Sequence, residues 1–433
     1  SWAWFGREPD VLTPDEIALL IALPQSPEAR RPARHPARAK RARQMILAQM
    51  VERGLLSQAR AADAAEERIP SDRQAFPGTA WHAAETVRWR SASPDGVLRS
   101  TLDKALQLEA KALIATLAKE GGEGVQASAL ILSLDGRAVR AAVGSASREA
   151  PGGWLDLTAR ARSPGSTLKP IIYAMAFADG IAAPHTRIND LPARFASYRP
   201  ENFDRTFRGE VTVAEALQHS LNVPAVRVLD RVGADRFLAS LRFAGGQPSL
   251  PSTMVRDAGL AVALGGIGLS AQDLAILYGA LGDGGKALPL AWTEEEAEAN
   301  AQAQGVSLVS PESAAEIISI LEASPAPPGR IPAALSNEAP AIAYKTGTSY
   351  GYRDAWAAGV GAGHVVIVWT GRPDGAPRPG VTGRKAALPT LMSLFDAVIR
   401  TGTVVAPARG GDEPSQGTET LAQFSPVAPP PAI

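Results

Sequence analysis

The chain has 433 residues, 45% of them hydrophobic, and is therefore long enough for two or three domains with a sizeable core. Its 44 basic residues balance its 44 acidic ones, and a formal net charge of zero argues against a general nucleic-acid binder, because such proteins must neutralise phosphates. The chain has no cysteine, which excludes disulfide frameworks, thiolate metal sites and cysteine nucleophiles.

The first part of the chain is expected to be helical. Thr13 as N-cap, Pro14 at the first helical position and Glu16 at the third predict a short helix. A second helix is expected over residues 37–53. It overlaps a basic run at residues 30–43, which we interpret as a solvated helix face; the alternative is a surface for anionic lipid or phosphate. No apolar run approaches the roughly 18 residues that a membrane-spanning helix needs.

The middle of the chain is expected to contain a helix, a hairpin and then an irregular alternation of helices and strands. The helix is predicted from Thr101 to the Gly121-Gly122 pair, and two strands with a tight turn at Asp135-Gly136 follow it. Further strands are predicted at IAYKTGTSY and AWAAGVGAGHVVIVWTG, before a last helix. This order favours an α+β fold, in which an antiparallel sheet is flanked by helices.

Composition divides the chain into four parts. A stretch rich in Pro, Ser, Trp and Gly predicts a linker after the first helices, and a Pro- and Ala-rich composition predicts a flexible tail at the end. The expected parts are a helical region at 1–68, a linker at 69–98, a main domain at 99–403 and the tail at 404–433.

Three short motifs occur in a fixed order and carry the chemistry. They are Ser166-x-x-Lys169, Ser220-x-Asn222 and the run YKTGTS from Tyr344 to Ser349. Taken singly, each has an ordinary structural explanation, such as a helix cap, a turn or an edge strand. Together they match the set shared by penicillin-binding proteins and serine β-lactamases, and they predict a serine nucleophile.

Lys169 is the expected general base for Ser166. Residues three apart on a helix share a face, so the amine of Lys169 can reach the Ser166 hydroxyl, which is a poor nucleophile until a base takes its proton. A lysine serves as a base only when burial or a second cation lowers its pKa, and Lys345 can supply that cation. The helix that is expected to begin near Ser166 also presents backbone N–H groups to an oxyanion.

The other motif residues suit substrate binding and proton transfer. Asn222 can position the base and bond the substrate backbone, and Ser220 can relay a proton to the departing amine. Thr346 and Thr348 point the same way in a strand, so both hydroxyls can hold a terminal carboxylate beside the second lysine. Gly347 lets the substrate backbone come close. We assign to substrate binding Thr346, Gly347, Thr348 and Ser349.

Over roughly residues 99–400 the chain resembles the class A, bifunctional penicillin-binding proteins, in particular their 1C branch. The resemblance extends beyond the motifs to ARSPGSTLKPIIYAMAFADG, YRPENFDRTFRGEVTVAEALQHSLNVPAVRVLDRVG and YKTGTSYGYRDAWAAGVGAGHVVIVWTGRPDGAPRPG. It implies a transpeptidase domain with the fold of penicillin-binding proteins and serine β-lactamases, working in the periplasm on peptidoglycan, with no cofactor and no metal.

The resemblance also implies the reaction. Ser166 would attack the carbonyl of the penultimate D-Ala in a stem peptide that ends in D-Ala-D-Ala, and the acyl-enzyme would pass to an amine of a neighbouring stem. β-Lactams would acylate the same serine. The backbone N–H groups of Ser166 and Thr348 would form the oxyanion hole.

The first residues, SWAWFGREPDVLTPDEIALLIALPQSPEARRPARHPARAKRARQMIL, resemble the end of a family 51 glycosyltransferase domain. The catalytic glutamates of that family lie in motifs upstream. We therefore expect this chain to be a fragment without glycosyltransferase activity, whereas its parent would have it. The parent would be anchored in the inner membrane by an N-terminal segment, with other cell-wall synthesis proteins as candidate partners.

Three alternatives stay open. A DD-carboxypeptidase uses the same site and passes the acyl group to water, although the class A resemblance favours an amine. A serine β-lactamase shares the motifs, but no Glu-x-x-Leu-Asn segment of the class A β-lactamase type lies between the second and third of them. A non-catalytic module that binds cell-wall peptides is disfavoured by the presence of Ser166, Lys169 and Lys345.

Overall fold

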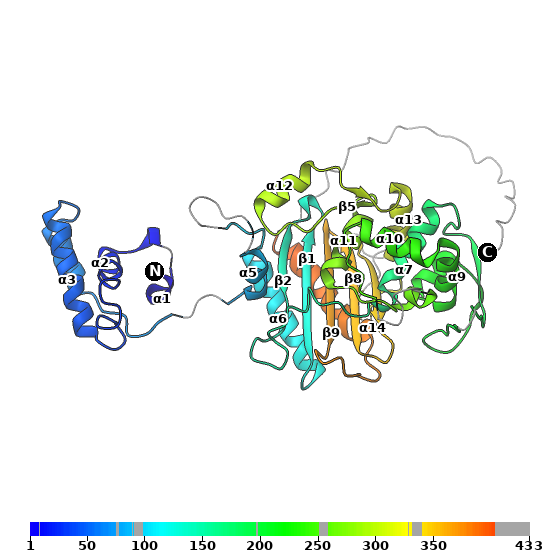
Figure 1. Cartoon of the computed structure of the whole chain (residues 1–433), viewed down its shortest axis with the longest axis horizontal. Helices are drawn as coiled ribbons and strands as arrows, with labels where there is room; N and C mark the ends of the chain where they lie inside the picture. Colours follow the sequence, from blue (N-terminus) through cyan, green and yellow to red (C-terminus); the bar gives the residue numbers. More distant parts are fainter. Residues whose placement is uncertain are drawn as a thin grey trace. The chain divides into compact units, whose positions relative to one another are not determined.

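The computed structural model describes most of the chain (Figure 1). The described residues are 1–7, 9–74, 78–88, 90, 98–195, 198–250, 259–327, 329–330 and 340–402. They fall into two compact units, Ser1–Thr79 and the chain from Ala80 onwards. The predicted tail at 404–433 and part of the predicted linker lie outside the described residues.

The first unit is helical, as predicted. The backbone N–H of Thr13 donates to the Glu16 carboxylate at 3.0 Å, as in a capping box. Most of the basic run is exposed or half-buried, but Arg43 is fully buried, and its guanidinium donates to the carbonyls of Ala65 and Glu67. This arginine is therefore a core residue of the unit, not part of a solvated face. The helices are α1 (Trp2–Phe5), η1 (Pro9–Val11), α2 (Pro14–Ala22), α3 (Pro36–Glu52) and α4 (Gln58–Glu66).

The second unit is built on one five-stranded antiparallel sheet. Its strands lie in the order β2-β1-β9-β8-β7, so the hairpin of β1 and β2 pairs with the last strand of the chain. β7, which carries the third motif, is an edge strand of this sheet, and β8 is its one partner among the described strands. The strands are β1 (Gln126–Ser133), β2 (Val139–Val143), β7 (Ala343–Thr348), β8 (Asp354–Gly361) and β9 (His364–Gly371).

Helices cover both faces of the sheet, which confirms the predicted α+β class (Figure 1). On one face, α6 (Lys104–Gly121) and α14 (Gly383–Arg400) pack against a core that includes Ile131 and Phe395. On the other face, α11 (Ala271–Gly282) packs against a core that includes Leu130 and Leu277. Successive residues of β1 alternate between these two cores, as the period of a strand requires.

A further group of helices extends the second core and carries the first two motifs. α7 packs against α9 and α13, and η5 packs against α9. The elements of this group are η3 (Gly165–Leu168), α7 (Lys169–Ala178), α8 (Val213–Gln218), α9 (Asn222–Val232), α10 (Ala234–Phe243), η5 (Leu260–Leu264) and α13 (Pro311–Glu322). The other small elements of the unit are α5 (Trp81–Val87), η2 (Asp135–Arg137), α12 (Glu294–Gln302) and two short antiparallel pairs, β3 (Arg187–Asp190) with β4 (Gly209–Thr212) and β5 (Lys286–Ala287) with β6 (Val306–Ser307).

Three local expectations differ from the structure. The helix expected from Thr101 begins at Lys104, because the Thr101 hydroxyl donates to the Val139 carbonyl and Asp103 is the N-cap. The turn between β1 and β2 is a longer one that contains η2. The stretch expected to be a linker contains α5, whose Ala83 belongs to the core of the second unit. Among the described residues, no helix combines the length and apolarity needed to cross a membrane.

Candidate active site

Ser166 lies in a 3-10 turn that leads into α7. The sequence predicts a helix beginning near Ser166, and the structure begins the α-helix itself at Lys169. Ser166 is half-buried, and its hydroxyl makes no hydrogen bond with any residue that the structure describes. The Ser166 hydroxyl is therefore accessible and has no competing partner within the described ranges.

Backbone packing against β7 positions this turn. A Cβ on Gly347 would lie 2.3 Å from the Pro164 carbonyl oxygen, and a Cβ on Gly165 would lie 2.7 Å from the Thr348 carbonyl oxygen. Gly165 also has a φ of +55°, a value that favours glycine. The sequence predicts Gly347 as a place for the substrate backbone; in the structure its missing side chain also makes room for the turn that carries Ser166.

Hydrogen bonds on both sides hold the turn in place. The Tyr278 hydroxyl donates to the Thr167 carbonyl at 2.8 Å, and the Trp356 indole donates to the Ser163 carbonyl at 2.9 Å. The Ser163 hydroxyl donates to the Gly265 carbonyl at 2.7 Å. Bonds of this kind lock a reactive group in one geometry, as preorganised sites require.

The amine of Lys169 is fully buried and has three acceptors. Its Nζ donates to the carbonyls of Ser220 and Leu221 at 2.7 and 2.9 Å, and to Asn222 Oδ1 at 2.7 Å. Burial lowers the pKa of Lys169 well below its usual range, the charge of Lys345 lowers it further, and Asp190 opposes both. The structure thus brings the first and second motifs together around one amine with a lowered pKa.

Ser220 links this lysine to the third motif. Its hydroxyl accepts from Lys345 Nζ at 2.7 Å, whereas its carbonyl accepts from Lys169. Ser220 stands between α8 and α9 with a φ of +58°, a strained value for a residue with a side chain. Burial, together with the nearby charge of Arg384, lowers the pKa of Lys345 to about 7. Two buried amines with lowered pKa values therefore contact Ser220, Lys169 at its carbonyl oxygen and Lys345 at its hydroxyl oxygen.

The residues assigned to substrate binding divide into two groups. Thr346 and Thr348 are both half-buried on β7, and the Thr348 hydroxyl accepts from the Gly383 N–H at the start of α14 at 3.0 Å. Ser349 is buried, and its hydroxyl accepts from the Asp354 N–H at 2.8 Å. That bond ties Ser349 into the connection between β7 and β8, and its assignment to substrate binding stays a prediction.

Sequence reasoning did not identify two polar residues behind Asn222. Asn202 Oδ1 accepts from the Asn222 backbone N–H at 2.7 Å, and both oxygens of Asp190 accept from Asn202 Nδ2 at 2.8 Å. Both residues are buried. Asn202 lies in the segment YRPENFD that carries part of the family resemblance, but nothing in the sequence relates it or Asp190 to Asn222.

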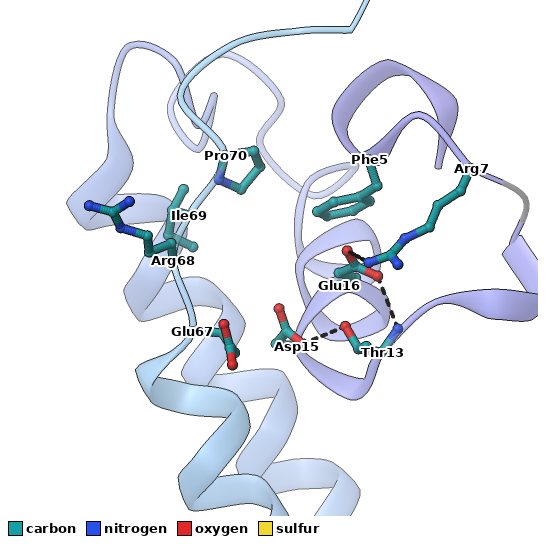
Figure 2. Close-up of a pocket in the computed structure, with 9 residues that line it drawn as sticks. All are labelled: Phe5, Arg7, Thr13, Asp15, Glu16, Glu67, Arg68, Ile69 and Pro70. Carbon is teal, nitrogen blue, oxygen red and sulfur yellow. Dashed lines mark hydrogen bonds and ion pairs between the residues drawn. The ribbon is translucent and has the colours of Figure 1, made fainter.

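The first unit has a separate hollow of about 320 Å³ (Figure 2). Two of its carboxylates are already engaged with neighbours: Glu16 pairs with Arg7 and with the Thr13 N–H, and Asp15 accepts from the Thr13 hydroxyl. The hollow is lined by Phe5, Arg7, Thr13, Asp15, Glu16, Glu67, Arg68, Ile69 and Pro70. It contains none of the motif residues.

Family models match both units. Residues 127–360 match the model described as the penicillin-binding protein transpeptidase domain, which spans the nucleophile turn and all three motifs. Residues 1–51 match the model described as a transglycosylase.

Individual relatives and solved structures agree with these matches. Penicillin-binding protein 1C of Escherichia coli is 36% identical over 403 residues, which are 92% of this chain and 50% of that protein. Penicillin-binding protein 1B of Vibrio cholerae is 28% identical over 90% of this chain and 52% of that protein. The chain thus spans about half the length of the curated relatives it matches.

Among solved structures, penicillin-binding protein 1A from Haemophilus influenzae superposes with a TM-score of 0.67 at 18% identity, covering 96% of this chain and 83% of that one. The PonA1 protein from Mycobacterium tuberculosis in complex with penicillin V gives a TM-score of 0.58 at 19% identity, covering 77% of this chain and 92% of that one. At these identities the likeness shows a shared fold.

Proposed function

The chain belongs to the class A penicillin-binding proteins, and we propose that its second unit is a serine DD-transpeptidase that forms a covalent acyl-enzyme on Ser166. The observation that carries the proposal is the pair of buried amines, Lys169 and Lys345, bonded to the carbonyl and the hydroxyl of Ser220. Perturbed pKa values that arise from burial and a like charge are typical of catalytic groups.

In the proposed acylation step, Lys169 is the base. The Lys169 amine now donates to three acceptors, and as a neutral amine it has only two N–H groups. It therefore gives up one of these bonds, and its lone pair can turn to take the Ser166 proton. The Ser166 oxygen attacks the carbonyl of the penultimate D-Ala, and the backbone N–H groups of Ser166 and Thr348 stabilise the oxyanion. When the C–N bond breaks, the Ser220 hydroxyl passes a proton to the departing D-Ala nitrogen.

Substrate recognition is proposed at β7. The terminal carboxylate of the stem peptide, or the carboxylate of a β-lactam, would be bound by the Lys345 charge and the hydroxyls of Thr346 and Thr348. An amine of a second stem peptide then attacks the acyl-enzyme and forms the cross-link. Because cross-linking takes place on the cell wall, we place this unit in the periplasm, with the parent protein held at the inner membrane.

Intact-mass spectrometry after incubation with several β-lactams tests the nucleophile. We expect one stable adduct, located by peptide mapping on the peptide that contains Ser166, and no adduct on Ser166→Ala. Ser147→Ala, at an exposed serine of the same unit, is the matched control and should be labelled like the unaltered chain.

Each other outcome selects an alternative. An adduct that Ser166→Ala still forms would contradict the nucleophile assignment. Rapid loss of the adduct with drug hydrolysis would indicate a β-lactamase, and no adduct with any drug would indicate a non-catalytic binding module. Incubation with a D-Ala-D-Ala peptide and an acceptor amine then separates a transpeptidase, which forms the new amide, from a carboxypeptidase, which forms only the free acid.

A further inference from the structure

Asn222, which accepts from Lys169, is itself held by a loop outside the three motifs. Its Nδ2 donates to the Glu201 carbonyl at 2.7 Å, and its backbone N–H donates to Asn202 Oδ1 at 2.7 Å. These bonds fix the amide so that Oδ1 faces the Lys169 amine. The position of the loop at residues 201–202 therefore decides where Asn222 stands.

Asn202 is held in turn by a buried carboxylate. Its Nδ2 lies 2.8 Å from each oxygen of Asp190 and 2.8 Å from the Thr206 carbonyl. Only 4% of Asn202 is exposed. With Nδ2 facing these acceptors, Oδ1 can only face the Asn222 N–H, so the orientation of this amide is determined by Asp190.

Asp190 is the last residue in this series of contacts, which runs from Asn222 through Asn202. It is fully buried at the end of β3, and its Oδ2 also accepts from the Arg208 backbone N–H at 2.9 Å. All of these partners are donors, as a carboxylate requires. A buried carboxylate that is held by neutral N–H groups exerts a long-range field, because little solvent screens it.

Two charged groups act on the Lys169 amine. The charge of Lys345 on β7 disfavours the ammonium form, and that of Asp190 on β3 favours it. The hydroxyl of Tyr173, one turn along α7, carries no charge, because burial raises its pKa far above the neutral range. Arg384 on α14 acts on Lys345. Asp190 is thus the one group of opposite sign that acts on this base within the part of the chain that the structure describes.

We propose that Asp190 is a positioning residue of the acylation site, which holds Asn222 against the Lys169 amine through Asn202 and supplies the buried negative charge that balances Lys345. This inference rests on the proposed acylation of Ser166. It assigns two functions to one carboxylate, and they predict two separable effects. Geometry governs the maximal rate of acylation, and charge governs the pH at which Lys169 becomes a base.

Asp190→Asn tests both effects in the full chain. An amide has only one acceptor oxygen, so its NH2 group would take the place of the second carboxylate oxygen and set a donor against the Asn202 Nδ2 donor, which now lies 2.8 Å from each oxygen of Asp190. We expect the maximal second-order rate of acylation by a fluorescent penicillin to fall at least about tenfold. We also expect the acid limb of the pH–rate profile to move to lower pH, because loss of the negative charge disfavours the protonated amine.

Asn189→Ala is the matched control, because this neighbour on β3 is half-buried and its side chain makes no hydrogen bond with a described residue. It should keep the rate and profile of the unaltered chain. The inference would be overturned if Asp190→Asn folds and keeps both the maximal acylation rate and the acid limb of the unaltered chain. It would also be overturned if Asn189→Ala changes the rate and the profile as much as Asp190→Asn does.

If Asp190→Asn does not fold, Asn202→Ser decides, since it keeps the carboxylate and breaks the link to Asn222. A maximal rate within about twofold of the unaltered chain would then overturn the inference, and a loss of at least about tenfold supports it. A lack of acylation in the unaltered chain would overturn the proposed function itself, so the two failures are distinguishable.

Discussion

Lys169 and Lys345 illustrate how burial changes the acid–base properties of a lysine side chain. Both are buried, and burial is the first cause of the lowered pKa in each. The charge of Lys345 is a second cause of the lowered pKa of Lys169, and both causes favour the neutral form of its amine. A neutral amine is what the proposed role of Lys169 as a base requires.

The lowered pKa of Lys345 predicts that carboxylate binding depends on pH. Lys345 is charged below its pKa of about 7 and neutral above it. We therefore expect the dissociation constant of a β-lactam in the pre-acylation complex to increase as the pH rises through about 7. Stopped-flow measurements of acylation against drug concentration, from pH 6 to pH 9, give this constant at each pH.

The methyl ester of the same β-lactam is the control for this prediction. Because it has no carboxylate, its dissociation constant should change little over the range. Equal pH dependence of acid and ester, or weaker binding of the acid at low pH, would contradict the assignment of Lys345 to carboxylate binding.

At the scale of elements, the site depends on how close β7 comes to the turn that carries Ser166. The two backbones can come this close because Gly165 and Gly347 have no side chains. β7 is also bonded through Thr348 to the start of α14. Any shift of β7 therefore changes the distance between Ser166 and the proposed carboxylate-binding groups.

Gly347→Ala is expected to impair acylation more than stability. The new Cβ would lie 2.3 Å from a backbone oxygen, which cannot rotate away as a side chain can, so β7 or the Ser166 turn must move. We expect the acylation rate to fall at least about tenfold, because misplacement of about 1 Å can cost on the order of 100-fold. Fluorescent penicillin labelling and thermal unfolding of the same sample measure both quantities.

Gly363→Ala, in the turn between β8 and β9, separates strain from function. Gly363 has a φ of +70° and open space around its Cβ position, so alanine there costs about 1 kcal/mol in stability. Its acylation rate should be unchanged. If both variants lose acylation equally, a general loss of stability, and not the approach of β7 to the turn, would be the cause.

At the scale of the whole molecule, the candidate site belongs to one unit. Ser166, Ser220 and Lys345 all lie in the unit that begins at Ala80, and the first unit has its own small hydrophobic core. A core of its own is the property of a part that folds as a unit. We therefore expect the acylation chemistry to be independent of the stability of residues 1–79.

Leu47→Asp tests this independence. Leu47 is buried on α3 in the first core, and an unpaired buried carboxylate costs several kcal/mol, enough to unfold the first unit. We expect hydrogen exchange to increase across residues 1–74 while the acylation rate stays within about twofold of the unaltered chain. Met45→Asp, at an exposed position of the same helix, is the control and should leave both units folded. Loss of acylation in Leu47→Asp alone would contradict the prediction.

Features that depend on neighbours in the sequence were predictable from it. The α+β class, the helix that follows Thr13, the pairing of β1 with β2 and the strand character of YKTGTS all rest on hydrophobic periodicity, caps and turn residues. The three motifs were likewise recognisable as the set shared by penicillin-binding proteins and serine β-lactamases. Local expectations were wrong where a distant contact intervened, as at Thr101, whose hydroxyl bonds to β2.

Features that depend on distant contacts were decided only by the tertiary structure. Asp190, Asn202 and Asn222 are connected by hydrogen bonds although they lie in different segments, and no spacing rule relates them. Burial of the two lysines, which lowers their pKa values, likewise comes from packing of α7, α9 and β7 around them. The sequence states which functional group each side chain has. The pKa of that group and its bonding partners depend on solvent exclusion and distance, which exist only after the chain has folded.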